Sequence, residues 1–101
     1  MGYYRSDSIE SYSTDDGGFV LLVTKRGRLY ERRIEPHGFV TQIEAATILR
    51  PRVSRVAVYQ WIKSGKLKDD IVDGVSMIRL SRLRKFAAKH GYEFAPPYPK
   101  I

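Results

Sequence analysis

Thr41–Lys63 reads TQIEAATILRPRVSRVAVYQWIK, a stretch that predicts two short helices joined by a turn. Thr41 is a good N-cap, and Glu44 stands three positions later, so the pair forms a capping box. Apolar residues then recur at helical spacing as far as Leu49. Pro51 disfavours helical geometry at the residue before it, so we expect the first helix to end near Leu49.

The second predicted helix begins after Ser54, which can cap it, with Val53 and Val58 placed as a hydrophobic staple. Val58 and Ile62 are four residues apart and share one face, and Trp61 lies beside them. The opposite face carries a mixture of apolar, aromatic, polar and basic side chains, namely Val56, Tyr59, Gln60 and Lys63. This helix therefore has an apolar back and a front suited to contact with a partner.

Composition restricts the class of protein. A chain of 101 residues is long enough for one domain with a modest core, and 43% hydrophobic residues fits a folded protein. No apolar run approaches the length of a membrane span, and the N-terminus lacks the apolar core of a signal peptide, so we expect a cytoplasmic protein. There is no cysteine, and the two histidines are far apart, so we expect no disulfide, no metal and no cofactor.

Charge is unevenly distributed along the chain. Residues 1–35 hold six basic and six acidic side chains, whereas residues 36–101 hold twelve basic and five acidic ones. The second part therefore carries the whole net charge of +7. A positive charge concentrated in this way suits a polyanionic partner. The alternative interpretation is a solvated, charged surface that keeps the protein soluble.

The N-terminal third predicts an arm and a hairpin. Residues 1–18 have no clear period, so we expect a loose arm, with Asp15 and Asp16 in a turn. Strands are expected near 19–25 and 28–35, joined by a short loop that contains a glycine. Two strands alone are marginally stable, so this hairpin must pack on the helices of its own chain or on a second copy.

The C-terminal part predicts a second hairpin, a last helix and a tail. Asp73-Gly74 between two apolar pairs is a strong signal for a two-residue hairpin turn. Ser81 is the expected cap of a last helix that ends at Gly91. The proline-rich tail, residues 93–101, is expected to be extended and irregular.

Residues 36–92 resemble the winged helix-turn-helix domain of the excisionase and MerR-like group. The motifs that carry the resemblance are Phe39-Val40-Thr41, Glu44-Ala45-Ala46, Val53-Ser54-Arg55, Val58-Tyr59-Gln60-Trp61-Ile62 and Ser64-Gly65-Lys66-Leu67. The resemblance implies an α+β fold, in which three short helices and a β-hairpin wing follow the N-terminal β-hairpin. It also implies binding of double-stranded DNA, with the second helix in the major groove and the wing beside the backbone.

Several side chains suit this role independently. Gln60 can read adenine and Arg55 can read guanine through bidentate hydrogen bonds. Asp73 at the wing turn is unfavourable beside phosphate, so Arg79 and Lys68 at the wing base are the expected phosphate contacts there. The candidate DNA-contacting residues are Arg52, Ser54, Arg55, Val56, Tyr59, Gln60, Lys63, Lys66, Lys68 and Arg79.

The expected function is sequence-specific DNA binding by a phage- or plasmid-type regulator of recombination or transcription. Because one small domain makes few base contacts, we expect a homodimer or a cooperative assembly on DNA through the N-terminal hairpin, with the apolar strand Phe19–Val23 as the best candidate for the contact. The alternatives are a DNA-packaging or replication-initiation module, and a protein-interaction module that has lost DNA binding. The sequence contains no phosphate-binding glycine loop, no metal-ligand cluster and no paired nucleophile and base, so we expect neither an enzyme nor a small-molecule substrate.

Overall fold

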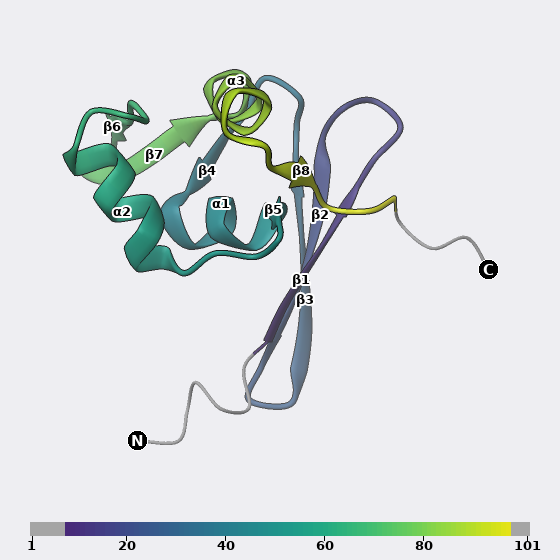
Figure 1. The fold of residues 1–101 in the computed structure, drawn as a ribbon. Coiled ribbons are helices and arrows are strands. Elements are labelled where there is room, and N and C mark those ends of the chain that lie inside the picture. Colours follow the sequence, from purple (N-terminus) through teal and green to yellow (C-terminus); the bar gives the residue numbers. More distant parts are fainter. Residues whose placement is uncertain (1–7, 98–101) are drawn as a thin grey trace.

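The computed structural model describes residues 8–97, which form an α+β domain with three helices and antiparallel sheets (Figure 1). In chain order the elements are β1 Ser8–Ser13, β2 Phe19–Lys25, β3 Arg28–Ile34, β4 Phe39–Thr41, α1 Gln42–Ile48, β5 Leu49–Arg50, α2 Arg55–Lys63, β6 Asp70–Val72, β7 Val75–Arg79, α3 Leu80–His90 and β8 Glu93–Phe94. The strand orders of the three sheets are β1-β2-β3, β4-β7-β6 and β5-β8.

Local signals predicted both helices of the central stretch. Thr41 caps α1, and both halves of the capping box are formed: the Glu44 amide donates to the Thr41 hydroxyl and the Thr41 amide donates to the Glu44 carboxylate. The helix ends at Ile48, next to the position that Pro51 predicted. Ser54 caps α2, since its hydroxyl accepts from the Ala57 amide at 3.1 Å.

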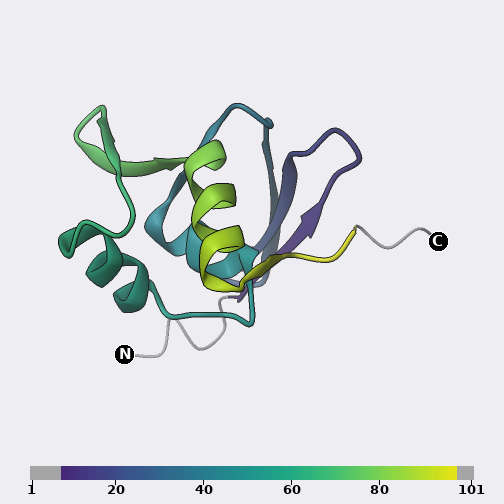
Figure 2. The same ribbon diagram turned by 45° about the horizontal axis from the view of Figure 1, so that its top comes forward.

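The two hairpins also follow their predicted turns. Arg26 and Gly27 join β2 to β3 with positive φ angles of 53° and 76°, and the turn of Asp73 and Gly74 has φ angles of 51° and 79°. In both views the β6–β7 hairpin projects from the same end of the molecule as α2 (Figures 1 and 2). The β2–β3 hairpin is longer, and its tip extends beyond the helices (Figure 1).

A single hydrophobic core joins the N-terminal sheet to the helices. Phe19 and Leu21 of β2 are almost fully buried, in the same cluster as Ile48 of α1, Val58 of α2 and Leu83 of α3. Burial of each of these side chains contributes about 1.5–3 kcal/mol. The N-terminal hairpin is therefore part of the body of the domain rather than an appendage.

This placement corrects the expected contact between copies. Phe19–Val23 was expected to join two copies, but Phe19, Val20 and Leu21 are buried within the chain. Moreover, β2 is the central strand and pairs with β1 on one side and β3 on the other, so it has no free edge. The apolar side chains Phe19 and Leu21 instead belong to the same buried cluster as residues of the three helices.

The prediction of a loose arm is wrong for residues 8–13. They form β1, which pairs with β2 along its whole length. Ser11 is buried, and its hydroxyl donates to the carbonyl of Thr47 in α1 at 3.0 Å. The polar composition of residues 8–13 concealed this strand, because the group that pairs with the buried Ser11 hydroxyl lies 36 residues away in the sequence. Residues 1–7 of the predicted arm lie outside the described residues.

The turn after β1 confirms the structural interpretation of the Asp15-Asp16 pair. Asp16 accepts hydrogen bonds from the Thr14 hydroxyl and, at 3.1 Å, from the Gly18 amide. The hydrogen bond from Thr14 has the largest effect, and together the two bonds hold the pKa of the Asp16 carboxyl below its usual value. Gly18 is required because a Cβ there would lie 2.3 Å from the Ile34 carbonyl oxygen.

The predicted start of the last helix is also corrected. The last helix begins at Leu80 with Arg79 as its N-cap, and Ser81 lies inside the first turn. The Leu80 amide donates to the Gly38 carbonyl at 3.1 Å, so a distant backbone group replaces the expected serine cap. Gly91 ends the helix in the left-handed conformation, as predicted.

The tail is more ordered than expected. Its first two residues form β8, which pairs with β5, and Ala95 is buried in the core. A further bridge joins Pro97 to Ser13 of β1. The part of the predicted tail from 98 to 101 lies outside the described residues.

Two leucines of the N-terminal sheet test its role in the core. We expect Leu21→Ala to lower the free energy of unfolding by about 2–5 kcal/mol, because it leaves a cavity in the shared core. Leu29 on β3 is 67% exposed, so Leu29→Ala is the matched control and should change stability by less than about 0.5 kcal/mol. Chemical denaturation of both variants measures the difference, and equal effects would contradict the shared core.

Candidate nucleic-acid interface

The inner face of α2 is fixed by packing on the core. Val58 is fully buried, and the Trp61 ring lies 4.6 Å from the Phe86 ring of α3 and 5.6 Å from the Tyr92 ring, between centroids. These contacts place the apolar back of the helix against α3, as the helical spacing predicted. The opposite face of α2 is consequently turned away from the body of the domain.

The outer face of α2 is exposed along its whole length. Its exposed side chains are Arg55, Val56, Tyr59, Gln60 and Lys63. No residue of α2 is acidic, so this face presents two cations, one amide and one phenol without a competing carboxylate of its own. Such a combination can donate hydrogen bonds to phosphate and to base edges, and can make apolar contact with a thymine methyl group.

A concave surface lies between this face and the N-terminal end of α1. Arg55, Val56 and Tyr59 line it together with Gln42, and its volume is about 360 Å³. A second hollow of about 250 Å³ adjoins it, lined again by Gln42 and Arg55 and also by Val75 and Ser76 of β7. The surface therefore joins both helices of the central stretch to the β6–β7 hairpin.

A hydrogen-bonded chain holds the β6–β7 hairpin in this position. The Gln42 amide donates to the Ser76 hydroxyl at 3.0 Å, and that hydroxyl donates to the Asp69 carboxylate at 2.5 Å. The chain links α1, β7 and the loop after α2. Gln42 was not among the predicted site residues, since a polar residue just inside a helix N-terminus carries no signal of its own in the sequence.

Two residues of the predicted site have partners within the chain. Ser54 accepts from the Ala57 amide as the cap of α2, so its hydroxyl already has a structural role. Arg52 forms an ion pair with Glu10 of β1 at 3.1 Å, and both side chains are about half exposed. An exposed pair of this kind is weak, and phosphate can displace the carboxylate.

Three predicted phosphate contacts lie apart from the outer face of α2. Arg79 stands at the end of β7, where its guanidinium lies 4.7 Å from the centroid of the Phe39 ring. Arg79 is three residues beyond Ser76, which lines the hollow next to Arg55, and this separation is about 10 Å along the strand. Lys66 and Lys68 line a separate groove against α3. The structure thus brings Arg55, Val56 and Tyr59 together, with Gln60 and Lys63 on the same helix face.

Comparisons with known proteins add no further assignment. The chain matches no protein-family model, no curated protein and no solved structure. Within residues 8–97 no group of histidine, cysteine, aspartate and glutamate side chains has the arrangement of a metal site. No helix in the same range is long and apolar enough to cross a membrane.

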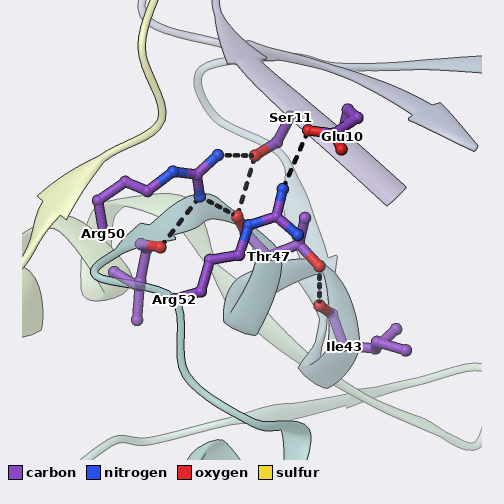
Figure 3. Close-up of polar contacts among 7 residues, drawn as sticks. Glu10, Ser11, Ile43, Thr47, Arg50 and Arg52 are labelled. Carbon is purple, nitrogen blue, oxygen red and sulfur yellow. Dashed lines mark hydrogen bonds and ion pairs between the residues drawn. The ribbon is translucent and has the colours of Figure 1, made fainter. Parts of the chain in front are cut away.

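The segment that carries the chain from α1 to α2 is held by Arg50 (Figure 3). Its guanidinium donates to the Thr47 carbonyl at 2.5 Å and to the Leu49 carbonyl at 3.0 Å, and it also reaches the Ser11 hydroxyl at 3.4 Å. Burial lowers the pKa of Arg50 from its ordinary value, but the group remains a cation at neutral pH. A positive charge at the C-terminal end of α1 is favourable because the helix dipole is negative there.

We expect Arg50→Met to lower the free energy of unfolding by about 1–3 kcal/mol, because it leaves helix-end carbonyls without their charged donor. Arg52→Met removes a neighbouring arginine whose ion pair is exposed, and should cost at most about 1 kcal/mol. Thermal melting of the two variants compares them. If Arg52→Met costs as much as Arg50→Met, the carbonyl contacts of Arg50 are not important for stability.

Proposed function

We propose that this protein binds double-stranded DNA through the outer face of α2. The observation that carries the proposal is the exposed, acid-free face of α2 beside the concave surface shared with α1 and β7. In this interpretation α1 and α2 form a helix-turn-helix, and the β6–β7 hairpin is the wing of a winged domain similar to those of excisionases and MerR-like regulators. The protein then has no catalytic role and acts on DNA in the cytoplasm.

Within this proposal, Arg55 and Gln60 read base edges while Lys63 and Tyr59 hold phosphate. Arg55 lies at the first position of α2, the end of a recognition helix that usually enters the major groove. Val56 is exposed beside it and suits contact with a thymine methyl group. The wing contributes Val75 and Ser76 rather than Arg79, because these two adjoin Arg55 across the hollow.

Specific binding by so small a surface calls for more than one copy on the DNA. The contact between copies uses a surface other than Phe19–Leu21, which is buried in the core. Adjacent or inverted sites would bring two such copies together. This arrangement suits a regulator of recombination or transcription as well as a module that marks a site for packaging or replication.

A second candidate function is protein binding at the same surface. Four exposed apolar or aromatic residues surround the concave surface, namely Ile43, Val56, Tyr59 and Val75, each between 46% and 59% exposed. Such residues are typical anchors for a protein partner. The two functions differ in their response to salt, since protein binding through these residues involves no release of counterions from phosphate.

We expect binding to duplex DNA to weaken steeply with salt. If about five phosphates are contacted, the logarithm of affinity should fall against the logarithm of salt concentration with a slope of about −4 to −5. Fluorescence anisotropy with a labelled duplex at several salt concentrations measures this slope. Absence of binding at low salt, or a slope near zero, would favour the protein-interaction function.

A further prediction separates base reading from phosphate contact. Gln60→Ala should cost about 1–3 kcal/mol on the preferred site and little on random duplex, because a base contact is lost. Lys63→Ala should weaken both duplexes alike and reduce the salt slope by about one. The preferred site comes from selection on a random-sequence library with the purified protein. Arg28→Ala, at the exposed tip of the β2–β3 hairpin, is the control and should change neither affinity.

Equal losses on both duplexes for Gln60→Ala and Lys63→Ala would mean that α2 contacts the backbone without reading sequence. Circular dichroism of each variant shows whether it is folded, so that a loss of affinity is not mistaken for misfolding. All three positions are exposed, so the substitutions remove no core packing.

A further inference from the structure

A basic groove runs between α3 and the loop that follows α2. Its polar lining consists of Lys66, Lys68, Arg82, Lys85, Lys89 and His90, and its volume is about 220 Å³. Residues 66–68 of this loop and residues of α3 line the groove together. Only the lysines of the loop were among the predicted DNA contacts, and α3 was not.

Most of the charge in the groove has no ion-pair partner among the described residues. Arg82 pairs with Asp70 at 2.9 Å, but none of the ion pairs found in residues 8–97 involves the four lysines of the groove. Lys85 and Lys89 are one helical turn apart on α3, where like charges repel each other. Four unpaired lysines on one short surface therefore favour an anionic partner.

The spacing along α3 fits the backbone of a nucleic acid strand. From Arg82 through Lys85 to Lys89 the helix rises about 10 Å. This length is about three times the 3.4 Å rise per nucleotide of one strand along the duplex axis. Lysine ammonium groups are point charges on flexible stems, so they suit a phosphate track that has no fixed orientation.

An acidic protein partner fits the groove less well. Protein interfaces depend on exposed apolar or aromatic anchors at their centre. The apolar residues in this groove are Leu67 and Phe86, which are 3% and 6% exposed and so belong to the core. The groove thus offers charge without an anchor, which is the pattern of contact with a nucleic acid backbone.

The groove faces a different direction from the outer face of α2. Trp61 of α2 contacts Phe86 of α3, and Tyr59 lies about 200° from Trp61 around the helix, at about 100° per residue. A straight duplex on the outer face of α2 therefore lies on the far side of this helix from α3. One short duplex cannot fill both surfaces.

We infer that the groove between α3 and the loop after α2 binds the phosphate backbone of a second nucleic acid segment. This inference rests on the proposed function of α2, and it adds that one copy of the protein can hold two segments together. The first segment is read at α2, and the second is held at the groove without regard to sequence.

The test is a titration of the ¹⁵N-labelled full-length protein with a duplex of about ten base pairs, one helical turn. Such a duplex is too short to bend from one surface to the other. We expect the amide signals of Tyr59 and Gln60 to shift first, and those of Lys85 and Lys89 to go on shifting after the first set has saturated.

Two double variants complete the design. Lys85→Gln with Lys89→Gln should abolish the second phase and leave the affinity of the first within about twofold, because both side chains are exposed and line the groove, not the concave surface beside α2. Lys25→Gln with Arg28→Gln removes the same charge from the tip of the β2–β3 hairpin and should leave both phases intact.

The outcomes distinguish the two proposals. Shifts on α3 without shifts on α2 would support the groove and refute the proposed function of α2. The inference is overturned if the amide signals of α3 do not shift in excess duplex. It is also overturned if the α3 and α2 signals shift together and the Lys85→Gln, Lys89→Gln variant weakens binding at both surfaces. Stronger binding of polyglutamate than of the duplex at the α3 signals would also overturn it, in favour of an acidic protein.

Discussion

Arg50 and Ser11 together close the C-terminal end of α1 and tie this helix to the N-terminal sheet. Helix ends leave carbonyl groups without partners, and burial of such groups is costly unless a donor reaches them. Arg50 supplies that donor to Thr47, while Ser11 donates to the same carbonyl from β1. At the other end of α1, Glu44 pairs with Arg32 of β3 at 2.6 Å. Both ends of the helix are therefore tied to the N-terminal sheet, which covers one side of α1 and leaves another side for α2.

Predictions of the fold succeeded where the signal was local. Ser54 caps its helix, Asp73-Gly74 makes its turn and Gly91 ends α3, because each needs only the residues next to it. They failed where the partner was distant. The Ser11 hydroxyl donates to a carbonyl 36 residues away, which anchors the polar strand β1 on α1, and the Leu80 amide at the start of α3 donates to the Gly38 carbonyl. No local pattern carries such information.

Predictions of the candidate site divide in the same way. The exposed face of α2 follows from helical spacing, since a helix with one apolar side must turn its other side outward. The residues of other elements that lie near that face are placed by tertiary packing alone. Gln42 lines the concave surface because its amide reaches Ser76 across two elements. Arg79 stacks on Phe39, an aromatic partner that the strand pairing of β4 with β7 places opposite it. Spacing along the chain could not place either residue.

Arginine and lysine side chains make different contacts in this protein, and the difference matters for how the protein would bind DNA. Several arginines connect elements through ion pairs, carbonyl contacts or aromatic rings, namely Arg32, Arg50, Arg52, Arg79, Arg82 and Arg84. No ion pair or ring contact within residues 8–97 involves Lys63, Lys85 or Lys89. Since lysine holds phosphate as a point charge, the lysines would supply affinity without specificity in the proposed complex. Base reading in the proposed complex then falls to Arg55 and Gln60, whose side chains are exposed on α2 and can approach a base edge.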